Sequence, residues 1–362
     1  MVNFRDDPLT WLGRLATDGK KADWIAPDQL CIADAEVGRA VLHNKDHRFK
    51  ERSDFFKTRN GEFGPRDAQI AIGRKAKAFI TAGISLCDFD AIVEGLGAES
   101  LWPQGGCMLI GKASRSLLAS DERSKRFNVL LDEIIQVRIY DRDLKRPHLI
   151  KAFFRRRAFM RAFARERDAH VVRMNGEPRD VLDIVFDHGG GANHAQLAEV
   201  FLGFAFSLNS SVGLALSWTL MLTLKHGRTF ESSRNLTSES LRLFPVAWLF
   251  DRQPEAPIDI LGHQVTPQQS VIVSPYAIHR NAEYWPDPEK FLPERWNDQP
   301  DQSAWIPFGA GPHSCVAMSL TYDLIEKILH RLCAPTAPKI EIIGEKPSIG
   351  VALAPPMFRI RR

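Results

Sequence analysis

The chain has 362 residues, of which 44% are hydrophobic and 25% are charged, so it is a globular chain that can bury a large core. Its net charge of +4 does not indicate a nucleic-acid partner, because no dense basic run alternates with aromatic residues. Five scattered cysteines without a CxxC pair argue against a disulfide framework or a zinc site and favour the reducing cytoplasm. The N-terminus lacks an apolar signal core, which predicts a soluble, bacterial-type protein without an N-terminal membrane anchor.

The first third of the chain predicts short strands followed by helices. Residues 22–34 predict two strands around a turn, and residues 35–44 predict a helix. Residues 45–65 are charged and turn-rich, and residues 66–82 predict a basic helix. The arginine-dense region 120–169 predicts helices with a solvated face, and a nucleic-acid or anionic-membrane surface is the alternative.

Two glycine motifs resemble functional loops but lack an essential part. The segment from Gly106 to Lys112 resembles a phosphate-binding loop, but Ala113 replaces the hydroxyl residue and no apolar strand precedes it. The segment from His188 to Gly191 resembles an esterase oxyanion loop, but the chain has no Gly-x-Ser-x-Gly nucleophile. We therefore interpret the second segment as a turn between helices.

Residues 199–225 form the longest apolar run, which is long enough to cross a bilayer. Asn209, Ser210 and Ser211 lie at its middle, where polar groups would be costly in lipid. A buried central helix of a large soluble domain explains the same composition.

The next segments contain a possible ion pair and several strands. Glu239 and Arg242 lie at i and i+3 of a predicted helix, where a surface pair is the simplest interpretation. A hairpin is expected over residues 258–274, and Arg295 follows in a Pro-Glu-Arg segment. Strands are also expected at residues 340–343 and 357–360.

The most informative segment is a glycine-rich loop that ends on a cysteine. Its ordered residues are Phe308, Gly309, Gly311, His313 and Cys315, and a helix with an apolar stripe from Val316 to Leu332 is expected to open at the cysteine. A thiolate is favoured at a helix start, where it can attack, form a disulfide or bind a metal. A buried structural thiol is the alternative.

This Phe-Gly-x-Gly-x-His-x-Cys spacing resembles the proximal haem loop of the cytochrome P450 superfamily. The Glu-x-x-Arg and Pro-Glu-Arg segments resemble two further motifs of that family, in the same order. The resemblance is strong over residues 199–332 and weaker before them. It implies a mainly α fold with small β-sheets (α+β), shortened between the long central helix and the Glu-x-x-Arg helix. It also implies one domain over residues 1–362, with a sheet-rich lobe at about 1–60, 255–280 and 338–362 and a helical haem lobe for the rest.

The resemblance implies a role for each matching residue. Cys315 would be the axial ligand of the iron in haem b (iron protoporphyrin IX). His313 and Arg252 would hold propionates, and Phe308 would pack near the sulfur. The remaining proximal residues are Gly309, Gly311 and Ala317, which stands where the family has glycine, and the core-locking Glu239, Arg242 and Arg295.

The resemblance also implies distal residues on the long helix. Aligned on Trp218, Ser210 replaces the family's acid and Ser211 its threonine, with Asn209 beside them facing bound oxygen. Ser211 retains a hydroxyl donor. Ser210 cannot titrate near neutrality, so the proton relay must be water, substrate or another residue.

The implied function is a cytochrome P450-type oxidoreductase, a monooxygenase that oxidises a small organic substrate in secondary metabolism. Electrons would come from a ferredoxin-type partner, with Lys327 and Arg331 supplying positive charge. The missing acid motivates two alternatives. One is atypical chemistry such as peroxide-driven oxidation, oxidative coupling or dehydration, and the other is a catalytically silent haem- or partner-binding protein.

Overall fold

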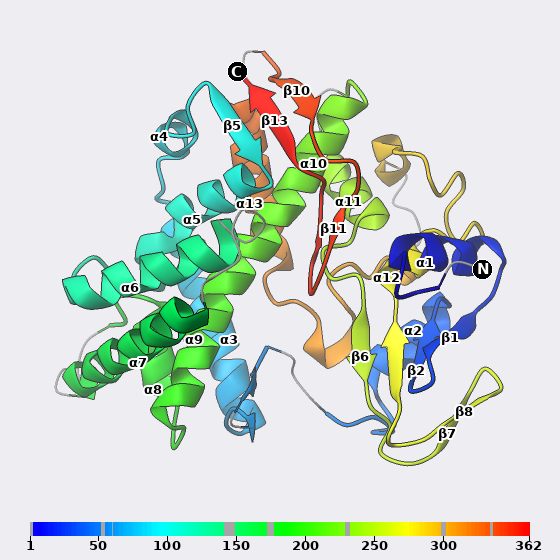
Figure 1. Ribbon diagram of the computed structural model, residues 1–362, viewed down its shortest axis with the longest axis horizontal. Helices are drawn as coiled ribbons and strands as arrows, with labels where there is room; N and C mark the ends of the chain where they lie inside the picture. The colour runs from blue at the N-terminus through cyan, green and yellow to red at the C-terminus, as the bar shows by residue number, and fades with distance from the viewer. Residues whose placement is uncertain are drawn as a thin grey trace. The chain divides into compact units, whose positions relative to one another are not determined.

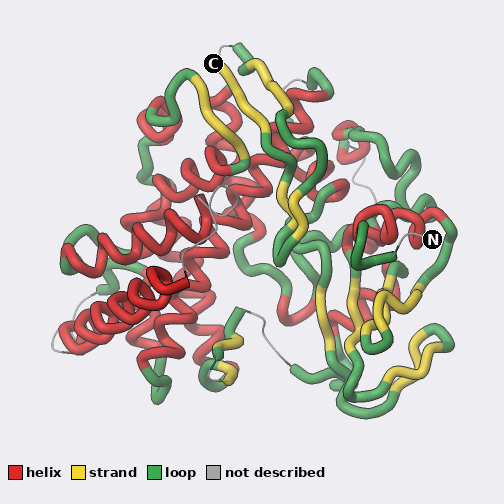
Figure 2. Tube along the Cα trace, in the orientation of Figure 1, coloured by secondary structure: helices red, strands yellow, loops and turns green. Residues whose placement is uncertain are grey.

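The computed structural model describes residues 3–51, 55–59, 61–140, 149–171, 177–228, 232–297, 302–333 and 336–362 (Figures 1 and 2). The chain divides into two compact units, which we consider separately. Unit 1 comprises Met1–Glu51, Trp218–Met318 and Gly344–Pro356, and unit 2 comprises Arg52–Ser217, Ser319–Ile343 and Met357–Arg362. Helices predominate and the sheets are small, which confirms the predicted mainly α fold. The single-domain organisation stays a prediction.

Unit 1 combines short strands with short helices. Its helices are α1 (Pro8–Thr17), α2 (Ala35–His43), α11 (Ser233–Leu243), α12 (Pro275–Ile278), and the 3₁₀ turns η3 (Pro293–Trp296), η4 (Gln302–Ala304) and η5 (Gly311–His313). Its strands are β1 (Ala22–Ala26), β2 (Gln29–Ile32), β6 (Phe250–Arg252), β7 (Ile258–Ile260), β8 (His263–Val265), β9 (Ser270–Val273), β11 (Ser348–Ile349) and β12 (Leu353–Ala354).

The main sheet of unit 1 has the order β1-β2-β9-β6. β2 and β9 are parallel although more than 200 residues separate them, and the other two pairs are antiparallel. The unit's apolar core includes Leu30, Val271 and Trp285 and extends to Ile306 and Ala310 of the glycine-rich loop. The loop is therefore anchored to the sheet core on its N-terminal side.

Unit 2 is mostly helical. Its helices are α3 (Arg66–Ile84), α4 (Phe89–Glu94), α5 (Gln104–Leu118), α6 (Lys125–Ile135), η1 (Gln136–Tyr140), α7 (Leu149–Val171), α8 (Val181–His188), α9 (His194–Phe206) and η2 (Ser207–Val212). Its strands are β3 (Lys57–Thr58), β4 (Gly61–Glu62), β5 (Glu99–Trp102), β10 (Lys339–Ile342) and β13 (Phe358–Arg361), and the C-terminal strands β10 and β13 form a sheet with β5 in the order β10-β13-β5. α10 (Gly213–Lys225) continues from unit 2 into unit 1, and α13 (Met318–Leu332) follows the glycine-rich loop.

The glycines that resemble a phosphate-binding loop lie inside helix α5. A Cβ on Gly106 would lie 2.6 Å from the carbonyl oxygen of Gly213, and a Cβ on Gly213 would lie 2.6 Å from Cα of Cys107. These glycines let α5 approach the long helix closely. The segment from Gly106 to Lys112 is thus a helix-packing surface, whereas the segment from His188 to Gly191 forms the predicted turn between α8 and α9.

The apolar run predicted at residues 199–225 is a continuous helix of 32 residues, His194–Lys225. Among the described residues it is the one helix long and apolar enough to span a membrane, and 61% of its most apolar stretch is buried. The N-cap Asn193 accepts from the backbone N–H of Gln196, whose side chain accepts from the N–H of Asn193, so a capping box starts the helix. The next described helix is α11, which begins at Ser233.

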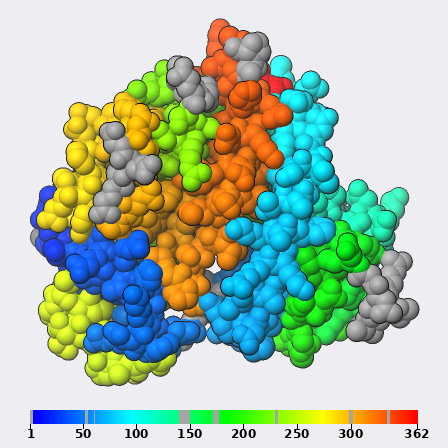
Figure 3. Space-filling model, turned by 180° about the vertical axis from the view of Figure 1, so that it is seen from behind, coloured from blue at the N-terminus to red at the C-terminus, as the bar shows by residue number. Residues whose placement is uncertain are grey.

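One predicted boundary needs correction. The helix after Cys315 begins at Met318 rather than at the cysteine, and Val316 is 54% exposed instead of joining the buried stripe. The predicted stripe continues correctly through Leu320, Leu324, Ile328 and Leu332, which are all buried. The opposite side of α13, orange in Figure 3, lies at the surface of the molecule. Cys315 therefore ends a turn rather than starting the helix.

Candidate functional site: a cysteine loop and a helix bulge

The glycine-rich loop closes on itself through backbone hydrogen bonds. The N–H of Cys315 donates to the carbonyl of Phe308 at 2.9 Å, and the N–H of Ser314 donates to the carbonyl of Gly311 at 3.1 Å. Gly309 and Gly311 both have φ of +73°, which a side chain would disfavour. The spacing of the two glycines thus makes a compact loop that presents the cysteine at its end.

Gly311 is required by packing as well as by its backbone conformation. A Cβ at this position would lie 2.7 Å from Cα of His43 and 2.9 Å from the carbonyl oxygen of Leu42, both in α2. At Gly309 the nearest atom, a ring carbon of Phe250, would be 3.5 Å away. Helix α2 therefore presses against the loop at Gly311, and β6 lies against it at Gly309.

Cys315 is the one exposed thiol among five cysteines that are all described and form no disulfide. Burial raises the pKa of the Cys31 thiol, and it raises the pKa of Cys333 to about 12. Cys87, which is half-buried, has a pKa raised mainly by burial. The accessible sulfur is therefore the one at the end of the glycine-rich loop.

Arg252 and His313, the residues predicted to hold propionates, both lie in unit 1. Arg252 is only 8% exposed, and its Nη1 donates to the backbone carbonyl of Asp251 at 2.7 Å. Because residues two apart on a strand face the same side, Arg252 shares the face of β6 on which Phe250 packs against Gly309. His313 is half-buried in the loop itself. A buried guanidinium is thus held on the side of β6 that faces the loop.

Glu239, Arg242 and Arg295, which the resemblance groups as a lock, form one hydrogen-bonded cluster that is largely buried rather than on the surface. The carboxylate of Glu239 accepts two hydrogen bonds from Arg242 at 2.9 Å and one from Arg295 at 3.1 Å. Arg242 also donates to the carbonyls of His279, Pro288 and Lys290. The side chains of Glu239 and Arg242 are 0% exposed. Burial lowers the pKa of Arg242, and Glu239 opposes this shift.

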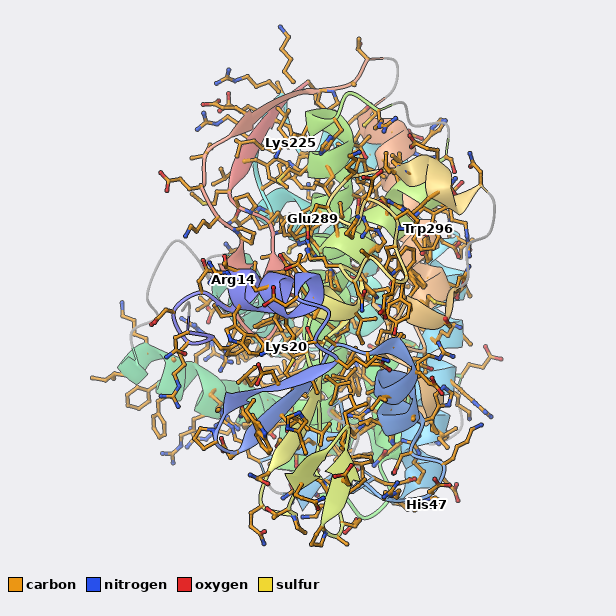
Figure 4. The ribbon with its side chains drawn as sticks, turned by 90° about the vertical axis from the view of Figure 1, so that its right-hand side faces the viewer. Arg14, Lys20, His47, Lys225, Glu289 and Trp296 are labelled. Carbon is orange, nitrogen blue, oxygen red and sulfur yellow. The ribbon has the colours of Figure 1, made fainter. Side chains whose placement is uncertain are left out.

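The lock is joined to the loop by a row of aromatic rings. Trp296, labelled in Figure 4, donates its indole N–H to Glu239 at 3.0 Å and packs on Trp305, with 5.4 Å between the ring centroids. Trp305 in turn packs on Phe308 at 5.8 Å. The sequence marked Phe308 but gave no signal for this row, because Trp296 and Trp305 lie outside the recognised glycine spacing.

His279 is a structural residue of the site to which the sequence assigned no role. Its Nδ1–H donates to the carbonyl of Arg242 at 3.0 Å, and its Nε2 accepts from the N–H of Ile306 at 2.9 Å. Burial, reinforced by the charge of Arg242, lowers the pKa of His279 to about 3. The neutral imidazole with hydrogen on Nδ1 therefore bridges the lock and the loop.

This buried imidazole predicts acid sensitivity. The unfolded chain binds a proton at His279 below pH about 6.5, but the folded chain does not until pH about 3, so the free energy of unfolding falls with pH between these values. We expect a loss of about 2 kcal/mol from this residue between pH 6.5 and 5, measured by urea unfolding. His279→Gln should reduce the slope of the free energy of unfolding against pH by about 1.4 kcal/mol per pH unit. The same substitution at the exposed His47 should leave this slope unchanged. Equal slopes in all three proteins would contradict the assignment.

The distal residues lie in unit 2 on η2, a π-helical bulge in the long helix. Such bulges occur often at functional sites. Ser211 is exposed, whereas Asn209 is 1% exposed and donates from Nδ2 to the carbonyl of Ala205 at 2.7 Å. Within the described residues, Oδ1 of Asn209 has no hydrogen-bond partner. The structure therefore separates Ser211 from Asn209, which faces the interior.

Ser210 lines a cavity of about 20 Å³ together with Gln104, Cys107 and Arg138. Oε1 of Gln104 is buried and finds no partner in the part of the chain that the structure describes. A cavity of this size has room for one water molecule, which needs polar partners such as these. Gln104 was not predicted, because nothing in its sequence context separates it from other helix-start glutamines.

The proximal residues all belong to unit 1, and the distal serines belong to unit 2. The structure brings together Glu239, Arg242 and Arg295, and it places Arg252 on the side of β6 that faces the loop. Ala317, which replaces the family's glycine, is half-buried after Cys315. That the serines face the same group as Cys315 stays a prediction.

The comparisons with known proteins agree with this fold and these motifs. A family model described as Cytochrome P450 matches residues 234–332. Cytochrome P450 4V2 of Rattus norvegicus is 28% identical over 166 residues, which are 38% of this chain and 32% of that protein. Cyclooctat-9-en-7-ol 5-monooxygenase of Streptomyces melanosporofaciens is 38% identical over 92 residues, 24% of this chain and 20% of that protein. The chain thus spans a third or less of these two relatives.

Solved structures match over nearly the whole chain. P450BioI, in complex with hexadec-9Z-enoic acid ligated acyl carrier protein, is 14% identical with a TM-score of 0.71, covering 99% of this chain and all of that one. A zebra fish cytochrome P450 with abiraterone is 20% identical with a TM-score of 0.68, covering 98% of each chain. The architecture is therefore that of the haem-thiolate fold. The cytochrome P450 family model matches residues 234–332, and the fold shared with solved cytochrome P450 structures extends over nearly the whole chain.

Proposed function

We propose that this chain is a haem-thiolate oxidoreductase that oxidises a small organic molecule, with Cys315 as the axial ligand of haem b. The observation that carries the proposal is the exposed thiol of Cys315 at the end of a loop fixed by two glycines with positive φ and by the buried Glu239–Arg242–Arg295 lock. The residues present fit haem b. The thiolate of Cys315 suffices for the axial position, and the buried cation of Arg252 suits a propionate.

The haem, when bound, would supply the oxidising chemistry, and the protein's residues would hold and surround it. The loop presents the sulfur of Cys315, the cation of Arg252 would pair with a propionate, and His313 would donate a hydrogen bond to a propionate. Oγ of Ser211 would donate a hydrogen bond and position water. A water in the cavity beside Ser210 and Gln104 would provide a route for protons that does not need the missing acid.

A cytoplasmic setting and a ferredoxin-type electron donor are part of the same proposal. The absence of disulfides among the five described cysteines supports a reducing compartment. Arg331 is a weaker candidate for contacting a donor than the sequence suggested, because it pairs with Asp90 at 2.9 Å and lies over the ring of Phe89. A relative named for oxidising cyclooctat-9-en-7-ol supports a small organic substrate and a place in secondary metabolism.

The reaction type is tested by comparing two oxidant systems. Turnover of a panel of small organic substrates would be measured with ferredoxin, its reductase and oxygen, and separately with hydrogen peroxide alone. Faster turnover with the reductase system supports a monooxygenase, and faster turnover with peroxide supports the atypical alternative. Haem uptake without turnover or substrate-induced spectral change in either system would overturn the enzymatic proposal in favour of a catalytically silent haem protein.

We expect Ser211→Ala to reduce product formed per electron consumed by about tenfold to a hundredfold, because the variant loses the hydroxyl that positions water. The measurement is the ratio of product to reduced nicotinamide consumed. Ser207→Ala is the matched control, since Ser207 is also exposed on η2 but does not replace the family's threonine. Equal losses in both variants would contradict the role of Ser211.

A further inference from the structure

Helix α7 carries an exposed stripe that the proposed redox function does not use. Ile150, Phe154, Arg157, Arg161 and Arg165 follow one another at spacings of four, three, four and four residues, so they lie on one face of the helix. Ile150 is 70% exposed and Phe154 is 61% exposed, and the three arginines are exposed as well. Large exposed apolar side chains next to a basic ladder are unusual for a merely solvated face.

The stripe borders a groove of about 530 Å³ between α6 and α7, which lie side by side in Figure 1. Leu130 and Phe154 give the groove an apolar part, and Arg126, Lys151, Arg157 and Arg161 surround it with positive charge. Its one acid, Glu133, is paired with Arg155 at 3.5 Å. No acidic partner within the described residues pairs with any of the four surrounding cations, so the groove has an excess of unpaired positive charge.

We propose that this groove docks an acidic amphipathic helix of a protein partner. The stripe from Ile150 to Arg165 is about 22 Å long, which is about four helical turns. Carboxylates spaced by four residues on a partner helix would meet Arg157, Arg161 and Arg165, and an apolar end would cover Phe154 and Ile150. This pairing would balance the positive charge of the groove and remove the side chains of Phe154 and Ile150 from water.

The concave shape favours a protein helix over an anionic bilayer. Helix α6 forms a second wall, and its Arg126 lines the same groove, so a partner helix lying in the groove would meet cations from both α6 and α7. The proposal uses no residue of the haem site and does not depend on the redox function.

The test measures binding of a fluorescent synthetic helical peptide with glutamate and leucine on one face, and of a matched peptide with lysine for glutamate. Arg157→Gln/Arg161→Gln removes two charges from the groove, and Arg5→Gln/Arg14→Gln removes two exposed charges elsewhere (Arg14 is labelled on α1 in Figure 4). We expect the groove variant to weaken binding of the acidic peptide at least about tenfold and the control variant to leave it within about twofold. The lysine peptide should not bind.

Circular dichroism melts would confirm that both variants are folded. Phe154→Ala, which retains all the charges of the groove, should also weaken binding of the acidic peptide. Equal weakening by both double variants, or undiminished binding by Phe154→Ala, would show non-specific charge attraction and overturn the proposal. Stronger binding to phosphatidylserine-containing vesicles than to the peptide, lost in the groove variant, would assign the surface to a membrane instead.

Discussion

Glu239→Gln is expected to lower the free energy of unfolding by about 3–5 kcal/mol, because it leaves the buried guanidinium of Arg242 without its balancing carboxylate. The same carboxylate accepts from Arg295, from Trp296 and from the backbone N–H of Leu292, so several elements lose their shared acceptor at once. The measurement is the urea unfolding curve of each purified protein. If the variant is too unstable to purify, the soluble fraction after expression gives the same ranking.

The control is Glu294→Gln, the removal of a nearby carboxylate of the same kind. Glu294 pairs with Arg228 at 3.1 Å, and both side chains are well exposed, so the change should cost less than about 1 kcal/mol. A loss at Glu239 that is no larger than the loss at Glu294 would show that the buried network does not stabilise the fold.

Gly311→Ala is expected to lower the free energy of unfolding by about 2–5 kcal/mol, through two separate effects. The backbone conformation with φ of +73° costs about 1–2 kcal/mol for a residue with a Cβ. The new methyl group would also lie 2.7 Å from Cα of His43, and moving backbone atoms of α2 adds about 1–3 kcal/mol. Unfolding curves measure the total, and the loss of hemin retained on gel filtration reports displacement of the loop.

Gly309→Ala separates the two effects, since Gly309 has the same φ but its nearest atom would be 3.5 Å away. Its free energy of unfolding should fall only by the cost of the backbone conformation, about 1–2 kcal/mol. Equal losses in the two glycine variants would mean that α2 does not press against the loop as the structure indicates.

The elements that the sequence predicted well are those with local signals. The strands around Pro27-Asp28, the helix α2 between Asp34 and Asn44, and the long apolar helix all carry periodicity or capping residues. The glycine loop was also readable, because positive φ at Gly309 and Gly311 demands that residue type. In these cases short-range chemistry determines the structure.

The features that the sequence did not reveal depend on contacts between distant segments. Glu239 and Arg242 look like an ordinary surface pair, and only residues 279–296 folding over them bury the pair. His279 acquires its role from partners at Arg242 and Ile306. The π-helical bulge at Ser207–Val212 and the cavity beside Gln104 likewise arise from packing rather than from periodicity.

The central claim is that the sulfur of Cys315 ligates the haem iron, and a reduced carbon-monoxide difference spectrum tests it most directly. The spectrum would be recorded for wild type, Cys315→Ala and Cys333→Ala after loading with hemin. We predict the Soret band of a thiolate-ligated haem in wild type and in Cys333→Ala, and its loss in Cys315→Ala. A wild type without this band, or a Cys315→Ala protein that keeps it, would contradict the claim.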